Sequence, residues 1–226
     1  MRAIRYLTFE ISSVCWLRTV HHECPIGHPE RYLYSHSEKT LTDESIMSFW
    51  KWCREAHGFR GIVLWHSYNE PGHHIKRIVA LQQQMRAQDK HQAFQLTTSL
   101  EELADSTDFD IVKFSDYEGG KELDDRILTA RGEGKPYAAM PRRGQCRRGM
   151  GWEVLIDNHG NWNLCCIDWR NEESFGSILE EPYDVLYDRW KAKASTIRWR
   201  DEAEYNALPR MCRSCLDINP AAGPFS

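Results

Sequence analysis

Residues 146–166 read CRRGMGWEVLIDNHGNWNLCC, and residues 208–215 read LPRMCRSC. The second stretch ends in a CxxC pair formed by Cys212 and Cys215. Two residues between thiols on a tight turn let both sulfurs point at a single metal centre without strain. These two stretches therefore indicate a metal site whose remaining ligands come from the first of them.

The first stretch contains a turn signal between two apolar segments. Asp157-Asn158-His159-Gly160 lies between EVLI and NWNLCC, which predicts a β-hairpin with Cys165 at the end of its second strand. Cys146 lies just before the first strand, so we expect the hairpin to bring both cysteines to one end of a small sheet. Cys166 would point to the opposite face if the strand continues, and we leave it out of the ligand set.

Three interpretations of these four thiols differ in what they bind. Buried cysteines can act as small hydrophobic residues, although four at this spacing argue against that reading. A structural zinc site of four cysteines also uses CxxC pairs, and it would make the protein a zinc-stabilised interaction module. Zinc sites usually use two such pairs, and here the first pair is split. The split pair favours an iron-sulfur cluster.

The residues between and around the cysteines carry a family resemblance. The order is Cys, Gly-x4-Cys-Cys-x-Asp, Gly-x-Ile, a segment with Tyr-Asp-x-Trp, and Leu-Pro-x-x-Cys-x-x-Cys. Over roughly residues 143–217 this order resembles the C-terminal SPASM or twitch extension of radical SAM enzymes. The resemblance implies an auxiliary 4Fe-4S cluster bound by Cys146, Cys165, Cys212 and Cys215.

The part of the chain before this extension alternates strand and helix patterns. Such alternation predicts βαβ units, a parallel sheet and right-handed crossovers. We expect an α/β fold with an abbreviated, open (partial) α/β barrel over 1–141, followed by a SPASM-like domain of hairpin and helix over 142–226. The predicted strands are 3–11, 61–66, 93–98, 110–115 and 136–140, and the predicted helices are 44–57, 73–88, 99–104 and 121–131.

Polar residues follow several predicted strands at their carboxyl ends, where sheets of this kind bind ligands. Cys15 follows the first strand, Glu70 lies in the SYNEP loop after the second, and Ser115 with Asp116 follows the fourth. We expect all of them at one rim of the barrel.

The radical SAM resemblance extends to this rim. In that family a CxxxCxxC loop after the first strand holds a cluster that chelates S-adenosylmethionine, and a Gly-Glu-Pro-like motif ends the second strand. Tyr68-Asn69-Glu70-Pro71 resembles the second motif, and Ser115-Asp116 resembles the polar end of the fourth strand. The resemblance implies that Glu70 accepts a hydrogen bond from the methionine amine and that a 5′-deoxyadenosyl radical is made from S-adenosylmethionine.

The first motif departs from the family pattern. Thr19 and His22 stand where the second and third cysteines are expected, and the other thiol of the loop is Cys24. One interpretation is that a loop histidine completes a site with Cys15 and Cys24, since imidazole replaces thiolate at some clusters. Another is that this cluster is lost, which leaves a single-cluster protein of electron transfer or structural type. A third is a redox or metal pair without a cluster. The candidate histidines are His21, His22 and His28.

Composition limits the cellular context and the partners. The chain has 226 residues, 41% of them hydrophobic, and a net charge of −4, which gives no general attraction for nucleic acid or anionic membranes. The N-terminus has no apolar core of signal-peptide length, and no apolar run is long enough to cross a bilayer, so we expect a cytoplasmic protein. Eight cysteines in a reducing compartment favour metal binding over disulfides. The expected partners are a peptide or small-molecule substrate and an electron donor.

Overall fold

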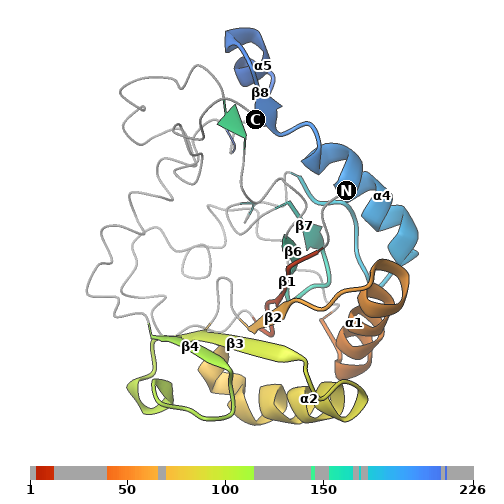
Figure 1. Ribbon diagram of the computed structural model, residues 1–226. Helices are drawn as coiled ribbons and strands as arrows, with labels where there is room; N and C mark the ends of the chain where they lie inside the picture. Colours follow the sequence, from red (N-terminus) through yellow and green to blue (C-terminus); the bar gives the residue numbers. More distant parts are fainter. Residues whose placement is uncertain are drawn as a thin grey trace.

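A six-stranded sheet with the order β4-β3-β2-β1-β6-β7 forms the centre of the computed structural model (Figure 1). The structure describes residues 4–12, 40–65, 70–114, 144–145, 153–164, 168, 173–209 and 212. Neighbouring strands from β4 to β6 are parallel, and β7 is antiparallel to β6. The strands are β1 (Tyr6–Phe9), β2 (Ile62–Trp65), β3 (Ala93–Thr98), β4 (Ile111–Phe114), β6 (Glu153–Ile156) and β7 (Trp162–Asn163).

The predicted α/β architecture is confirmed. The sheet is mostly parallel, and within the described residues it does not close into a barrel. The predicted strand over 93–98 coincides with β3, and β1, β2 and β4 are shorter than predicted by two to five residues. The strand predicted over 136–140 and the helix predicted over 121–131 lie outside the described residues.

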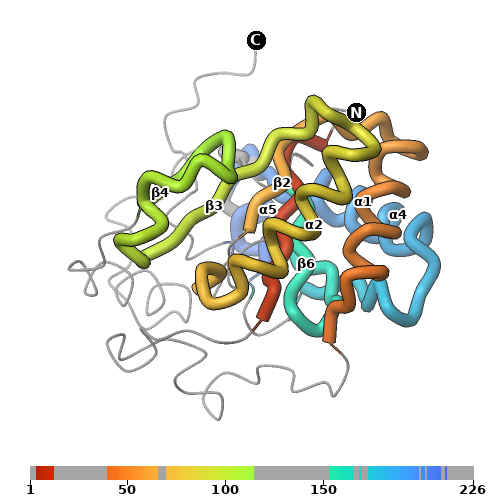
Figure 2. The backbone as a smooth tube through the Cα atoms, turned by 90° about the horizontal axis from the view of Figure 1, so that it is seen from below, coloured from red at the N-terminus to blue at the C-terminus, as the bar shows by residue number. Residues whose placement is uncertain are grey.

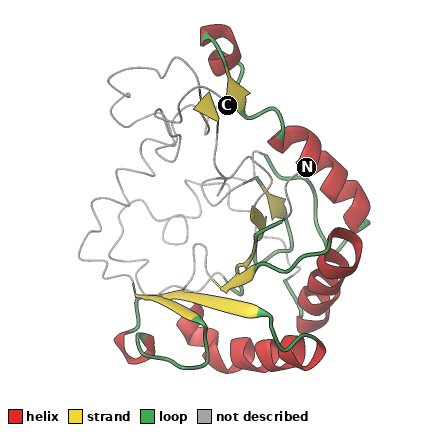
Figure 3. Cartoon of the chain, in the orientation of Figure 1, coloured by secondary structure: helices red, strands yellow, loops and turns green. Residues whose placement is uncertain are grey.

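Three helices lie along one face of the sheet (Figures 1 and 2). Figure 3 shows the same arrangement, with the described strands inside and the helices outside. In β1, β2, β3 and β6 alternate residues are fully buried, as a period of two requires, and Phe9 and Trp65 are examples. The ring of Phe9 stacks on Trp65 at 5.8 Å between centroids and meets Phe49 edge-on at 6.4 Å. The helices are α1 (Asp43–His57), α2 (Ile75–Gln88) and α4 (Tyr183–Ala194).

The ends of α1 follow from local sequence. Thr42 is the N-cap: its hydroxyl accepts a hydrogen bond from the backbone N–H of Ser45, and the Ser45 hydroxyl accepts one from the Thr42 N–H. Gly58 ends the helix at φ 62°, a left-handed conformation that favours glycine. Cys53 is fully buried on the apolar face of α1 and belongs to the core.

Two predicted helices begin or remain as 3₁₀ turns. In the range predicted as a helix over 73–88, the first two residues belong to the 3₁₀ turn η2 (Pro71–His74), and α2 begins at Ile75. Glu70 is the N-cap of η2. The helix predicted over 99–104 is a single turn, η3 (Glu101–Leu103). Proline at the start of η2 fixes the backbone but cannot donate a hydrogen bond, which suits the first turn of a helix.

The hairpin predicted after Cys146 forms, but it does not build a separate sheet. β6 pairs with β1 in parallel, so the hairpin extends the main sheet beyond β1. This pairing satisfies the backbone groups along β1, which would otherwise be an edge strand, and buries Val154 and Ile156. The domain boundary between residues 141 and 142 stays a prediction, and the sheet continues across it.

A second, two-stranded sheet lies farther along the chain. β5 (Gly144–Gln145) pairs antiparallel with β8 (Arg198–Trp199), which follows α4 and precedes α5 (Glu202–Asn206). β5 ends one residue before Cys146, and α5 leads to Cys212. None of the helices in the described part of the chain has the length and apolar character needed to span a bilayer.

Candidate functional site

The carboxyl ends of β1 to β4 lie at one edge of the sheet because these strands are parallel. Glu70 lies at this edge, after β2, with 3% of its surface exposed. This is the rim on which the sequence placed it. The other residues predicted there, Cys15, Cys24, Ser115 and Asp116, lie outside the described residues.

The Glu70 carboxylate accepts four hydrogen bonds. Its Oε1 accepts from the Gly72 N–H at 2.9 Å and from the Thr98 hydroxyl at 2.6 Å. Its Oε2 accepts from the N–H and the hydroxyl of Ser99, at 2.8 and 2.6 Å. A carboxylate has about four lone-pair positions, so these donors hold it in one orientation. A ligand amine can reach Glu70 only by taking the place of one of these donors, and the two hydroxyl groups are the donors that can rotate away.

Thr98 and Ser99 were not identified from the sequence as site residues. Thr98 ends β3 and Ser99 follows it, and the register of β3 with β2 places Leu96 beside Trp65, the last residue of β2. Polar residues at the carboxyl end of a predicted parallel strand were the signal that could have revealed them.

The turn of the hairpin is ordered by Asp157. Its Oδ1 accepts from the backbone N–H groups of His159 and Asn161, at 2.9 and 2.8 Å. Its Oδ2 accepts from the side-chain amides of Asn161 and Asn163, at 2.9 and 3.2 Å. Gly160 closes the turn at φ 82°. The predicted turn is therefore confirmed, and it directs the chain toward residue 165.

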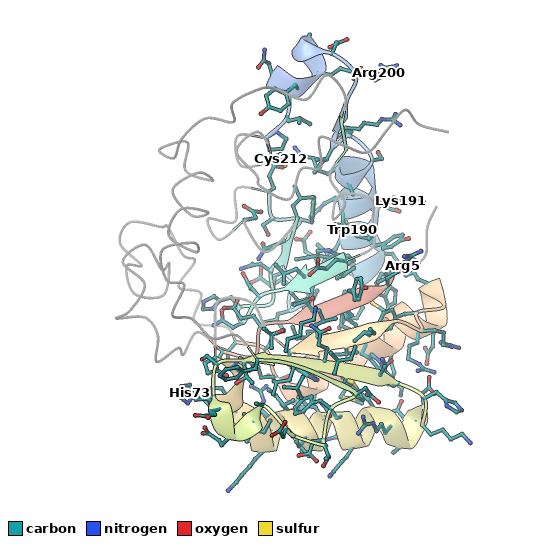
Figure 4. The ribbon with its side chains drawn as sticks, turned by 60° about the vertical axis from the view of Figure 1, so that its left-hand side comes forward. Arg5, His73, Trp190, Lys191, Arg200 and Cys212 are labelled. Carbon is teal, nitrogen blue, oxygen red and sulfur yellow. The ribbon has the colours of Figure 1, made fainter. Side chains whose placement is uncertain are left out.

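Cys212 is the C-terminal candidate ligand that the structure describes. Only 6% of its surface is exposed, and it belongs to the apolar cluster that contains Trp190, Ile197 and Leu208. In Figure 4 it lies beside the α4–α5 segment, far from His73 at the start of α2. Cys146, Cys165 and Cys215 lie outside the described residues.

The described residues around Cys212 fit an iron-sulfur cluster. Cys212 is buried and belongs to the hydrophobic core, and a thiol shielded from water suits a ligand of such a cluster. The pairing of β5 with β8 also brings the chain just before Cys146 against the segment that leads to Cys212. Within the described ranges no three His, Cys, Asp or Glu side chains are placed to hold a metal ion by themselves.

Two histidines, His73 and His74, directly precede α2. His74 is the N-cap of α2, and burial, followed by the charge of Arg77, lowers its pKa. His73 beside it is exposed. The His74 side chain makes no capping hydrogen bond to α2.

Comparisons with known proteins give two similarities. Residues 146–216 match the family model of SPASM, an iron-sulfur cluster-binding domain. The fold resembles a crystal structure of BtrN in complex with AdoMet and 2-DOIA, with a TM-score of 0.60 and 14% identity over 95% of this chain and 94% of that one. It also resembles selenomethionine BtrN in an open conformation, with a TM-score of 0.57 and 13% identity over 95% and 93% of the two chains. No curated protein sequence matches the chain.

Proposed function

We propose that this chain, which joins a SPASM iron-sulfur domain to the fold of the radical SAM enzyme BtrN, binds a 4Fe-4S cluster through Cys146, Cys165, Cys212 and Cys215. The observation that carries the proposal is the extent of the SPASM match, since residues 146–216 span all four cysteines. The burial of Cys212 supports it from the structure.

The protein's own residues would shield and orient the thiolates. Cys212 belongs to the hydrophobic core, whose burial would keep water from its thiol. The turn held by Asp157 fixes the strand that leads to Cys165. A cluster bound by four protein thiolates supplies one-electron redox chemistry, whose potential depends on burial and on hydrogen bonds to the sulfurs.

We further propose that the carboxyl edge of the sheet binds S-adenosylmethionine. The support is the fold shared with BtrN, which was solved with AdoMet. Glu70 would accept a hydrogen bond from the ligand's amine, and Ser115 and Asp116 would contact the ligand from the end of β4. Cys15 and Cys24, with a loop histidine, would hold a second cluster, and the enzyme would carry out radical chemistry on a peptide or small molecule, with a separate electron donor.

A second candidate function rests on one sequence observation. Thr19 and His22 stand where the family pattern has cysteines, which removes two thiolates from the N-terminal motif. A chain with this loop and an intact C-terminal site would be a single-cluster protein of electron transfer or structural type.

Metal content distinguishes these functions. Iron, labile sulfide and zinc per chain are measured on protein purified without oxygen, for the wild type and for the Cys15→Ala/Cys24→Ala variant. About eight irons falling to about four would support both sites. About four in both proteins would support the single-cluster function, and zinc in place of iron would reject both. With eight irons, 5′-deoxyadenosine formation from S-adenosylmethionine is the next assay.

A further inference from the structure

The carboxylate of Glu70 has four hydrogen-bond donors and almost no exposed surface. Two of the donors are the backbone N–H groups of Gly72 and Ser99, and two are the hydroxyl groups of Thr98 and Ser99. Together they fill the lone-pair positions that a carboxylate offers. Because only 3% of Glu70 is exposed, a ligand that binds this carboxylate has to displace a donor. The surroundings of each donor indicate which one leaves.

The N–H of Gly72 is held in place by close packing. Gly72 is buried in η2, and its N–H makes the capping hydrogen bond of that turn to Glu70. A Cβ atom at Gly72 would lie 2.5 Å from Leu100 Cδ1 and 3.0 Å from Glu70 Oε1, so the turn packs tightly against its neighbours. Moving this N–H away from the carboxylate would disrupt the start of η2, and we therefore regard it as a fixed donor.

The hydroxyl of Thr98 is also fixed. Only 1% of Thr98 is exposed, and the alternation along β3 places it on the same face as Phe94 and Leu96, which belong to the core. Its oxygen donates to Glu70 Oε1 at 2.6 Å and accepts from the N–H of Leu100 at 3.1 Å. Rotation of this hydroxyl would break both bonds at a buried position, where lost hydrogen bonds are costly.

The hydroxyl of Ser99 lies in a different environment. Ser99 follows β3 and is partly exposed, whereas Gly72 and Thr98 are buried. Its hydroxyl donates to Glu70 Oε2 at 2.6 Å, and its own N–H donates to the same oxygen at 2.8 Å. When the hydroxyl turns away, Oε2 keeps the N–H donor and Oε1 keeps both of its donors. Three donors then still orient the carboxylate while one position on Oε2 is open.

We infer that the Ser99 hydroxyl is an exchangeable donor that occupies the position on Glu70 taken by the ligand's ammonium group. Thr98 is a positioning residue that keeps the carboxylate oriented during the exchange. The identity of the ligand rests on the S-adenosylmethionine site proposed above. The exchange replaces a neutral O–H donor by a charged N–H donor, and charge-assisted hydrogen bonds are about twice as strong as neutral ones. Because Ser99 is partly exposed, the displaced hydroxyl can bond to water.

The two hydroxyl groups should therefore affect ligand binding in opposite directions. The test measures the dissociation constant of S-adenosylmethionine by equilibrium dialysis on the full chain purified without oxygen. Ser99→Ala removes the competing donor and should bind the ligand about two- to tenfold more tightly, the range that corresponds to one ordinary hydrogen bond. Thr98→Val removes a fixed donor and should bind it at least about threefold more weakly. General damage to the site would weaken binding in both variants.

Three controls show whether the effect of Ser99→Ala belongs to the exchange. Ser99→Thr keeps the hydroxyl and should bind S-adenosylmethionine like the wild type. Ser106→Ala should do so as well, because Ser106 is a partly exposed serine whose hydroxyl accepts from the N–H of Asp108 instead. An analogue of S-adenosylmethionine without the α-amino group should bind equally to the wild type and to Ser99→Ala, since it has no ammonium group to replace the hydroxyl.

Four results would overturn the inference. Ser99→Ala that binds S-adenosylmethionine no more tightly than the wild type would show that the hydroxyl does not compete with the ligand. An equal gain for the analogue without the amino group would show that the gain arises elsewhere. Unchanged binding in Thr98→Val would reject its positioning role. A wild type without saturable binding of S-adenosylmethionine would reject the proposed site itself, which the first three results leave standing.

Discussion

The hydroxyl of Thr98, at the end of β3, donates a hydrogen bond to the carboxylate of Glu70, after β2, over 2.6 Å. Both side chains are buried, and the bond joins two neighbouring parallel strands at the edge of the sheet where ligands of such folds bind. The orientation of Glu70 therefore depends on a residue that lies 28 positions farther along the chain.

Replacing Thr98 with valine should destabilise the protein by about 1–3 kcal/mol, because the buried Oε1 loses one of its two donors while side-chain volume is retained. The measurement is the free energy of unfolding from urea titration. Thr97→Val is the matched control, since the Thr97 hydroxyl has only a 3.5 Å contact with the Gln95 amide. We expect a change within about 0.5 kcal/mol for the control. Similar losses in both variants would contradict a special role for the Thr98–Glu70 bond.

Cys212→Ala should remove about four irons per chain, because a 4Fe-4S cluster needs its buried thiolate. Cys53→Ala is the matched control: Cys53 is equally buried, and burial raises the pKa of its thiol, which keeps it protonated and unsuited to metal binding. The control should keep its iron and lose about 1 kcal/mol of stability through the small cavity. Retention of all iron in Cys212→Ala would exclude Cys212 as a ligand.

Gly160→Ala should destabilise the hairpin more than Gly58→Ala destabilises the end of α1. Both glycines have positive φ, so alanine adds about 1 kcal/mol of backbone strain at each. At Gly160 the new Cβ would also lie 2.7 Å from Leu179 Cγ, whereas at Gly58 it would meet nothing within 4 Å. Overpacking adds about 1–3 kcal/mol, which thermal and urea unfolding would detect. Because the hairpin leads to Cys165, we expect Gly160→Ala alone to lose iron as well.

Stability should fall as pH decreases below neutral, in part because of His57. Its ring stacks on Tyr187 at 3.8 Å between centroids, and burial lowers its pKa below 6.5, against the opposing effect of Asp184. At acidic pH the unfolded chain then binds more protons than the folded one. The contribution of neutral His57 to the free energy of unfolding is therefore complete above pH 6.5 and is lost as the pH falls through the pKa that His57 has in the folded state.

His57→Phe should therefore flatten the dependence of unfolding free energy on pH between about pH 7 and about pH 5. Part of the slope should remain, because burial lowers the pKa of His74 in the same direction. Urea titrations at several pH values provide the measurement. A variant with the full wild-type slope would assign the acid sensitivity to other groups.

Several features of this protein were predictable from short stretches of sequence. The cap of α1 at Thr42, the turn at Asp157–Gly160 and the span of β3 each depend on residues within a few positions of one another. The parallel arrangement of β1 to β4 followed from the alternation of strand and helix patterns, since crossover helices impose it. Placing Glu70 at the carboxyl edge required only that arrangement.

The hydrogen-bond partners of Glu70 and Arg77 could not be predicted from short stretches of sequence. Nothing near Glu70 in the sequence identifies Thr98 and Ser99 as its donors, and nothing near Arg77 identifies Ile11 and Leu41 as its acceptors. Such contacts depend on which strands are neighbours and in which register, and residues far apart in sequence meet only after the sheet has formed.

The sequence by itself determined the cysteine pattern, the turn of the hairpin and the approximate positions of several strands and helices, because turns, caps and apolar periodicity act over a few residues. Only the tertiary structure decided that the hairpin joins the main sheet beside β1. The hydroxyl of Thr8 in β1 donates a hydrogen bond to the carboxylate of Glu153 in β6, and these two residues are 145 positions apart in the sequence. The physical reason is that an open strand edge can accept any strand whose apolar face fits the core, and burial against α1 and α4 selects among them.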